Sequence, residues 1–263
     1  MNEEQQVQDI FRSITTEFEL FRKRMPSGKV FTFFKDQNIP VKFAKSKSGF
    51  QTIGVFKNKK VSGLAFVVYG SDDFFFGQFV DSRKNGRGYR LYPNGFLFKG
   101  EYANDKKVSG IVCEFATGLE IYNGEWSNDN YHGQGILRNP FNKSVYEGQF
   151  INGLFDGRGK IVWSTGDYYE GEFKQGRQEG KGKFVLIGIG KFKGFFKGGI
   201  FLNKDPALSI LVNDVAEARN ENSVMRNEGS DLSRIIQQRS GRQIDTREPV
   251  VSSQHDRVME FNF

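Results

Sequence analysis

The sequence predicts an all-β repeat array, in which stacked β-hairpins form an elongated, twisted antiparallel sheet. A five-residue phrase, aromatic–any–Gly–any–aromatic, recurs along residues 52–199, and its central glycines follow one another every 23 or 24 residues. Glycine and phenylalanine are abundant, with 31 and 28 copies. Repeats of this period indicate a one-dimensional array of small units, because each unit buries its apolar face only against its neighbours.

The repeat positions are seven glycines and the aromatic residues two places before and after them. The glycines are Gly54, Gly77, Gly100, Gly124, Gly148, Gly171 and Gly194. The aromatic residues are Phe75, Phe79, Phe98, Tyr102, Tyr122, Trp126, Tyr146, Phe150, Tyr169, Phe173, Phe192 and Phe196. The first copy, residues 52–56, is weaker, because Thr52 stands where the other copies have a ring. We predict a structural role within the repeat for all of these positions.

Each unit is predicted to be a β-hairpin. Alternate side chains of a strand share a face, so Tyr146, Gly148 and Phe150 lie on the same side. The glycine leaves a gap between two rings, which we expect a neighbouring unit to fill with an aromatic or aliphatic group. Tight turns follow at Asn152-Gly153 and Gln175-Gly176, because Asn and Gly tolerate positive φ. A single hairpin is too small to be stable, so the units must stack.

The second strand of each unit carries two more glycines, about eleven and thirteen residues after the first aromatic, as Gly157 and Gly159 do. This pattern resembles the MORN repeat (membrane occupation and recognition nexus), written Y-x-G-x-F-x-x-G-x-x-x-G-x-G. The resemblance covers residues 52–199, somewhat over half of the chain. It implies the same fold that the alternation of rings and glycines predicts.

Several units depart from the MORN pattern, and the first and last lack most of its second half. The unit that begins at Phe75 has Ser82 in place of the first turn glycine. The unit that begins at Phe98 has Asp105 there, and only Gly110 where the second glycine pair is expected. These departures leave open whether the array bends at the Phe98 unit.

Residues 1–25 are predicted to form an amphipathic helix. Its apolar residues are three or four places apart and make one stripe, which consists of Val7, Ile10, Phe11, Ile14, Phe18 and Phe21. The stripe has three possible roles: it folds back over the first edge of the sheet, it docks on a separate partner, or it lies on a membrane surface. The mixed charge of the polar side argues against the membrane.

The rest of the chain divides into three parts. Residues 29–51 are interpreted as a degenerate first repeat or cap, since terminal repeats are commonly atypical. Residues 52–202 form the repeat sheet of about seven units. The tail, residues 203–263, has helix-forming composition from Asp214 and then becomes polar without periodicity. We expect it to be weakly helical and then extended or disordered.

The charge is unevenly distributed. Residues 1–212 carry a net charge of +9 and the remainder −2, which gives the total of +7. A basic sheet attracts acidic partners such as acidic protein tails, anionic lipids or nucleic acid. Nucleic acid is the least favoured of these, because the aromatic residues occupy repeat positions and are used for packing between units.

Catalytic, cofactor and metal sites are not predicted. The two histidines, His132 and His255, have no partner set that indicates a catalytic triad. Gly190-Lys191 is followed by Phe192 instead of Ser or Thr, so the phosphate-binding loop signature fails. The single cysteine, Cys113, rules out an internal disulfide and favours a reducing compartment. No secretory signal and no run long enough to cross a bilayer is present, so we expect a cytoplasmic protein.

The resemblance implies a non-catalytic structural scaffold that assembles proteins through its MORN sheet. MORN proteins without a catalytic domain occur in ciliary axonemes, where they form radial-spoke heads, and in the cortical cytoskeleton. The expected partners are therefore other proteins of a large axonemal or cytoskeletal assembly. Two alternatives remain: a membrane-tethering or phosphoinositide-binding module, and a regulatory subunit that docks an enzyme. The sequence does not identify the residues that bind a partner.

Overall fold

The structure is a computed structural model, and it describes residues 40–47, 49–70 and 73–221. The helix predicted over residues 1–25, the first part of the degenerate repeat predicted over residues 29–51 and the end of the tail lie outside these residues. His255 also lies outside them.

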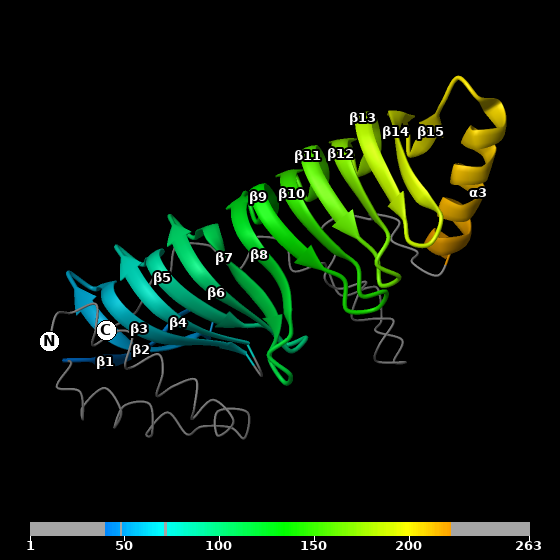
Figure 1. The fold of residues 1–263 in the computed structure, drawn as a ribbon. Helices are drawn as coiled ribbons and strands as arrows, with labels where there is room; N and C mark the ends of the chain where they lie inside the picture. The colour runs from blue at the N-terminus through cyan, green and yellow to red at the C-terminus, as the bar shows by residue number, and fades with distance from the viewer. Residues whose placement is uncertain (1–39, 48, 71–72, 222–263) are drawn as a thin grey trace, which may run out of the picture.

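The described strands form one open antiparallel sheet of fifteen strands, whose order in space is their order in the chain (Figure 1). The strands are β1 (Lys42–Lys45), β2 (Gln51–Lys57), β3 (Lys60–Gly70), β4 (Asp73–Val80), β5 (Arg83–Leu91), β6 (Phe96–Ala103), β7 (Lys106–Glu114), β8 (Glu120–Ser127), β9 (Asn130–Arg138), β10 (Val145–Ile151), β11 (Leu154–Val162), β12 (Tyr168–Lys174), β13 (Arg177–Leu186), β14 (Gly190–Lys197) and β15 (Ile200–Leu202). One helix, α3 (Pro206–Glu221), follows them. The predicted all-β array of stacked hairpins is confirmed.

Within each unit, from β2–β3 and β4–β5 to β14–β15, a two-residue turn closes the hairpin, and both residues of each turn have positive φ. The φ values are 51° and 85° at Asn152 and Gly153, and 50° and 81° at Gln175 and Gly176. Positive φ at both central residues is the signature of the type I′ turn, whose twist matches that of the flanking strands. These two turns lie where the sequence predicts them.

The turns of neighbouring hairpins are joined by backbone hydrogen bonds. The N–H of Gly153 donates to the carbonyl of Tyr131 at 2.8 Å, and that of Gly176 donates to the carbonyl of Phe155 at 2.8 Å. In each case the acceptor is the second residue of the preceding hairpin's second strand. A backbone N–H that would face water in an isolated hairpin therefore finds an acceptor in the preceding hairpin. Each added unit stabilises the array in this way.

Side chains compensate for the missing turn glycine of the Phe98 unit. The backbone N–H of Asp105 donates to the carbonyl of Lys84 at 2.9 Å, and its Oδ1 accepts the N–H of Lys84 at 2.8 Å. Asp105 has a φ of 71°, which costs a residue with a Cβ about 1–2 kcal/mol. The additional hydrogen bond offsets much of this cost, so the turn keeps its geometry without glycine.

The Phe75 unit uses the same arrangement. Ser82 donates its N–H to the carbonyl of Val61 at 2.8 Å, and its Oγ accepts the N–H of Val61 at 3.1 Å. In both units a short polar side chain therefore stands in for glycine and adds a hydrogen bond to the preceding hairpin.

One side of the sheet, called the inner face below, carries the first rings of the repeats. The ring of Tyr146 lies across Gly148 and Gly159 of its own hairpin. An ideal Cβ on Gly148 would lie 2.6 Å from the Tyr146 hydroxyl oxygen and 2.7 Å from the carbonyl oxygen of Arg158. The gap is thus filled by the unit's own first ring, and the prediction that a neighbouring unit fills it is wrong. The ring leans along its strand, a direction common for strand side chains.

The second ring of each repeat makes the contact between units. Phe150 packs edge-on against Tyr122 of the preceding unit at a centroid distance of 5.4 Å, and Phe173 packs against Tyr146 at 5.1 Å. The interplanar angles are 88° and 89°, the T-shaped arrangement that aromatic pairs prefer. First rings cover glycines within a unit, and second rings connect the units.

Helix α3 closes the last edge of the sheet (Figure 1). Asn213 accepts the N–H of Phe201 at 2.9 Å and donates to the carbonyl of Phe201 at 3.1 Å, so it pairs with the outer edge of β15 as a strand would. Asp205 caps the helix by accepting the N–H of Ala207 at 2.9 Å, and Pro206 takes the first helical position. The helix therefore starts ahead of Asp214, where helix-forming composition begins.

Candidate interaction surface

The sequence-predicted repeat residues lie together on the inner face or in the strands that form it. The first rings of five units are fully buried: Phe75, Phe98, Tyr122, Tyr146 and Tyr169. The second rings are buried in the same core: Phe79, Tyr102, Trp126, Phe150, Phe173 and Phe196. These side chains hold the array together and are not available to a partner.

The two terminal units depart from this arrangement. In the first unit Thr52 takes the place of the ring, and a Cβ on Gly54 would instead collide with the Cβ of Ala65, which faces it on β3. At the other end, the ring over Gly194 is that of Phe201 on β15, while Phe192 is only half-buried. The repeat rule thus holds for the internal units and is modified at both ends.

The tyrosine hydroxyls on the inner face serve the backbone. Tyr122, Tyr146 and Tyr169 donate to the carbonyl oxygens three residues further along their strands, at 2.7, 2.9 and 2.9 Å. Burial raises the pKa of all three well above the ordinary value for tyrosine. A hydroxyl that is neutral and bonded to a carbonyl is suited to packing rather than to proton transfer.

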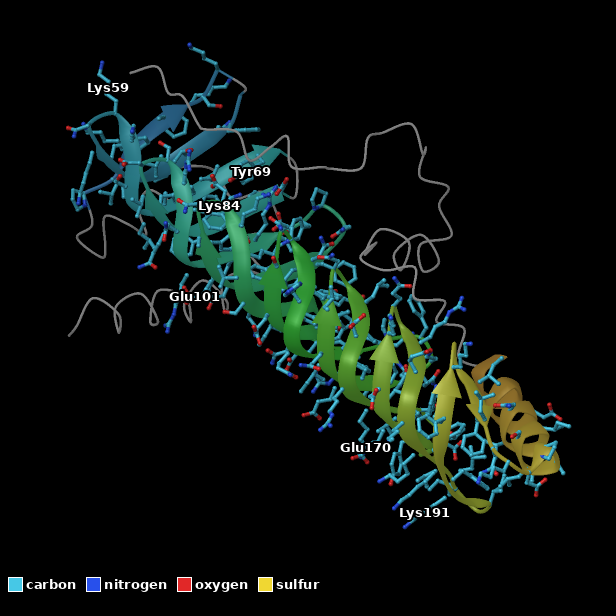
Figure 2. All side chains as sticks on the ribbon, turned by 90° about the horizontal axis from the view of Figure 1, so that it is seen from above. Lys59, Tyr69, Lys84, Glu101, Glu170 and Lys191 are labelled. Carbon is cyan, nitrogen blue, oxygen red and sulfur yellow. The ribbon has the colours of Figure 1, made fainter. Side chains whose placement is uncertain are left out.

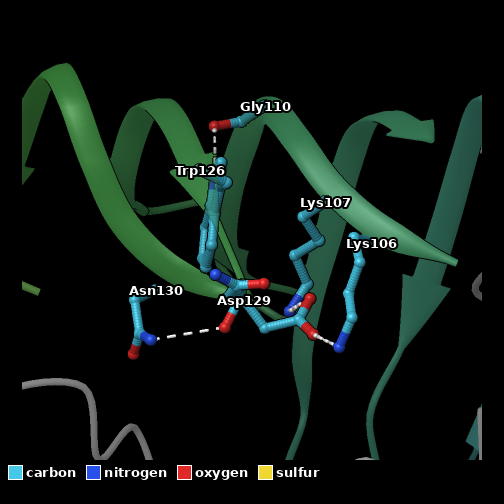
Figure 3. Close-up of polar contacts among 7 residues, drawn as sticks. Lys106, Lys107, Gly110, Trp126, Asp129 and Asn130 are labelled. Carbon is cyan, nitrogen blue, oxygen red and sulfur yellow. Dashed lines mark hydrogen bonds and ion pairs between the residues drawn. The ribbon is translucent and has the colours of Figure 1, made fainter. Parts of the chain in front are cut away.

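The inner face also carries a lysine, Lys107, whose role was not predicted from the sequence. In the middle units Tyr131 stacks on Tyr122 at a centroid distance of 3.8 Å, whereas in an earlier unit Lys107 takes the equivalent position. The Lys107 Nζ lies 4.8 Å from the Trp126 ring centroid and 3.6 Å from Asp129 Oδ1 (Figure 3). The cation therefore has both an aromatic and a carboxylate partner, and it replaces a stacked ring without leaving charge unpaired.

The outer face of the sheet, opposite to the inner face, is charged in its second half. The register places five residues directly opposite one another across successive strands: Glu147, Lys160, Glu170, Lys183 and Lys193. The first four alternate in sign, and Lys183 Nζ lies 2.8 Å from Glu170 Oε2. This hydrogen bond lowers the pKa of Glu170. The alternation ends at β14, where Lys193 faces Lys183.

The last three strands carry a basic and apolar surface that we call the end patch. It consists of Lys181, Lys183, Lys191, Lys193, Phe195, Lys197, Ile200 and Leu202. Phe195 is 57% exposed and faces Leu202, which is 48% exposed, across the β14–β15 pair. Among the residues that the structure describes, only Lys183 of these five lysines is in an ion pair. Figure 2 labels Lys191 and Glu170 in this region.

Four stretches of the sheet match a known repeat family. The MORN-repeat family model matches four stretches, residues 75–96, 122–140, 146–168 and 169–186. These four stretches are MORN repeats. MORN repeats are generally non-catalytic, and they commonly mediate protein or membrane-lipid interactions.

Proteins similar to this chain match less than half of it. Alsin from Rattus norvegicus is 29% identical over 134 residues, which cover 45% of this chain and 8% of alsin. Alsin from Homo sapiens is 28% identical over 129 residues, which cover 46% of this chain and 7% of alsin. The chain therefore matches less than a tenth of the length of these relatives.

The described part of the MORN sheet holds no group of three or more His, Cys, Asp or Glu residues that could bind a metal ion. His132 lies opposite Glu125 in the β8–β9 pair, and its Nδ1 is buried without a hydrogen-bond partner. Across residues 40–47, 49–70 and 73–221, no helix is long and apolar enough to cross a membrane. The end patch combines exposed lysines with exposed apolar side chains.

Proposed function

We propose that this chain is a non-catalytic scaffold whose MORN sheet binds an acidic protein partner on the end patch. The observation that carries the proposal is the break in the charge row. Lys193 stands directly opposite Lys183, although like charges in that position destabilise a strand pair. A carboxylate supplied by a partner relieves this repulsion, as Glu170 does for Lys183 on the other side.

The apolar members of the end patch support a protein partner. Phe195 and Leu202 form an exposed cross-strand pair between the lysines. Interface centres are enriched in aromatic side chains and are surrounded by polar groups, so Phe195 is suited to the centre of a binding site. The row of lysines supplies electrostatic attraction and fixes the orientation of an acidic segment.

A labelled polyglutamate peptide is a direct probe of this function. We expect it to bind the full-length protein in a fluorescence anisotropy titration, and Lys191→Glu/Lys193→Glu/Lys197→Glu to weaken the binding by at least about tenfold. A matched control reverses three exposed lysines at the other end of the sheet, Lys42, Lys45 and Lys57. Equal loss in both triple variants would mean that only net charge matters, and it would contradict a localised site.

The cellular setting is a finer proposal, which rests on the resemblance alone. We propose that the assembly belongs to a ciliary axoneme, as in radial-spoke heads, or to the cortical cytoskeleton. Tagging the endogenous protein and identifying its neighbours by proximity labelling tests this. Enrichment of axonemal or cortical proteins supports the setting, and enrichment of an unrelated compartment rejects it while leaving the scaffold proposal intact.

A membrane surface is the second candidate partner, and one observation favours it. The loop between β13 and β14 exposes Ile187 and Ile189, 57% and 47%, next to Lys191. Exposed apolar side chains beside lysines suit the interface of an anionic bilayer. Flotation with phosphatidylcholine vesicles, with and without phosphatidylserine, separates the candidates. Salt-sensitive flotation that requires phosphatidylserine and is lost in Ile187→Ser/Ile189→Ser supports the membrane.

A further inference from the structure

The outer face carries a second hydrophobic cluster in the first half of the sheet, which we call the outer apolar patch. It lies on β2–β7 and consists of Ile53, Leu64, Phe66, Phe76, Leu91, Leu97 and Cys113. Partly buried residues surround it, among them Val41 and Phe115. The patch belongs to the side of the sheet opposite to the stacked repeat rings.

The central side chains of the outer apolar patch are buried. Phe76 is 2% exposed, Phe66 is 4% and Leu97 is 7%. On the same face further along the sheet, by contrast, Phe195 is 57% exposed. The strands make their principal contacts with neighbouring strands, and α3 contacts β15 at the far end. The principal contacts of the described elements include none that places a second layer on the outer face over β2–β7.

The chain itself contains a segment that fits. Residues 1–39 are joined through Pro40 to Val41, which lies at the margin of the patch. If helical, the stripe from Val7 to Phe21 is about 21 Å long at a rise of 1.5 Å per residue. Six strands at a spacing of about 4.8 Å span about 24 Å. The stripe thus matches the patch in length and in apolar character.

We propose that the apolar stripe of residues 1–25 lies across the outer apolar patch and gives this end of the sheet a second hydrophobic layer. The occupied position is the outer face over β2–β7 rather than the first edge of the sheet. This layer makes the two ends different: the outer face is closed over β2–β7 and open over β13–β15. A partner that approaches the outer face then meets the end patch.

The rate at which Cys113 is alkylated tests this proposal, because Cys113 is the single cysteine and belongs to the outer apolar patch. It is 5% exposed, and burial raises the pKa of its thiol. In the full-length protein we expect slow alkylation by a maleimide. Phe11→Asp/Phe18→Asp, which places charge in the stripe, is expected to accelerate the alkylation by at least about tenfold.

The matched control places the same charges on the opposite side of the predicted helix. Gln5→Asp/Thr16→Asp is expected to leave the alkylation rate unchanged, with circular dichroism checking the sheet in both variants. Equal rates in the two double variants, or fast alkylation in the unmodified protein, would overturn the proposal. Protection of Cys113 that disappears on dilution would overturn it in favour of a second copy of the chain.

Disulfide trapping gives a second measurement that does not depend on disrupting the fold. Single cysteines are placed along the stripe, at positions 7, 10, 11, 14, 18 and 21, and the protein is oxidised at low concentration. We expect at least one of them to form an intramolecular disulfide with Cys113, and Gln5→Cys and Thr16→Cys to form none. Absence of a disulfide at all six stripe positions would contradict the proposed packing.

Discussion

At the scale of single residues, the central glycine of a repeat is required because a ring lies on it. Tyr146 covers Gly148 and Gly159, and its hydroxyl donates to the carbonyl of Gln149. The sequence predicts that these residues share a face, since strand side chains alternate. It does not predict which ring fills the gap, because that depends on the direction in which the ring leans along the strand.

Gly148→Val is expected to lower the free energy of unfolding by about 2–4 kcal/mol, because a branched side chain collides with the Tyr146 ring and with the facing strand. Urea denaturation measures the change. Gly70→Val is the control, since no atom lies within 4 Å of an ideal Cβ there. An equal effect at both glycines would show that strand propensity, and not the ring, determines the loss.

The buried tyrosines predict an alkaline limit to stability. Burial raises the pKa of Tyr146 and its equivalents in the folded state, so their contribution is complete below the ordinary tyrosine pKa of about 10. This contribution to stability is lost as the pH rises above about 10 towards the higher pKa of the folded state. Tyr122→Phe/Tyr146→Phe/Tyr169→Phe is therefore expected to lose less stability between about pH 8 and about pH 11 than the unmodified protein. Identical losses in the two urea-denaturation series would rule out these hydroxyls as the cause.

At the scale of elements, the hairpins are predictable because their signals are local. The Asn152-Gly153 turn and the alternation of rings fall within a few residues of one another. The charge row from Glu147 to Lys193 depends on cross-strand register, which bulges near Gly148 and Gly171 shift, so it emerges only from the structure. The hydrogen bond of Asp105 could not be predicted from the sequence either, because its partner Lys84 belongs to the preceding hairpin.

Asp105→Ala is expected to lower the free energy of unfolding by about 1–2 kcal/mol, because it keeps a Cβ at positive φ and removes the hydrogen bond to Lys84. Asp105→Gly loses the same hydrogen bond but removes the backbone strain, so its effect is expected to be smaller. Thermal melting of the two variants measures the difference. A glycine variant that is less stable than the alanine variant would contradict this explanation of the turn.

At the scale of the whole molecule, each MORN hairpin contacts mainly its two neighbours, so stability is a local property of the array. The start of α3 could not be placed from composition, because its apolar residues include Val212, which is buried against the sheet. The same long-range packing explains why the sequence could not locate a partner surface. The end patch depends on which strand lies last and on how lysines from two strands face each other.

Asn213→Ala removes both hydrogen bonds to the edge of β15 and is expected to fray that end alone. Amide exchange in β14 and β15 should accelerate by about tenfold, while exchange in β4–β8 stays unchanged. Asp214→Ala, at an exposed position one residue further on, is the control. Uniform acceleration along the sheet would indicate global unfolding and contradict the one-dimensional account.

The most direct test of the central claim, that the end patch is where the MORN sheet meets its partner, is a hydrogen–deuterium exchange footprint. The full-length protein is measured with and without the polyglutamate peptide. We predict added protection in β13–β15 and in the loop that joins β13 to β14, with no change in β4–β11. Protection that falls on the middle strands, or that is spread evenly over the basic sheet, would contradict the account.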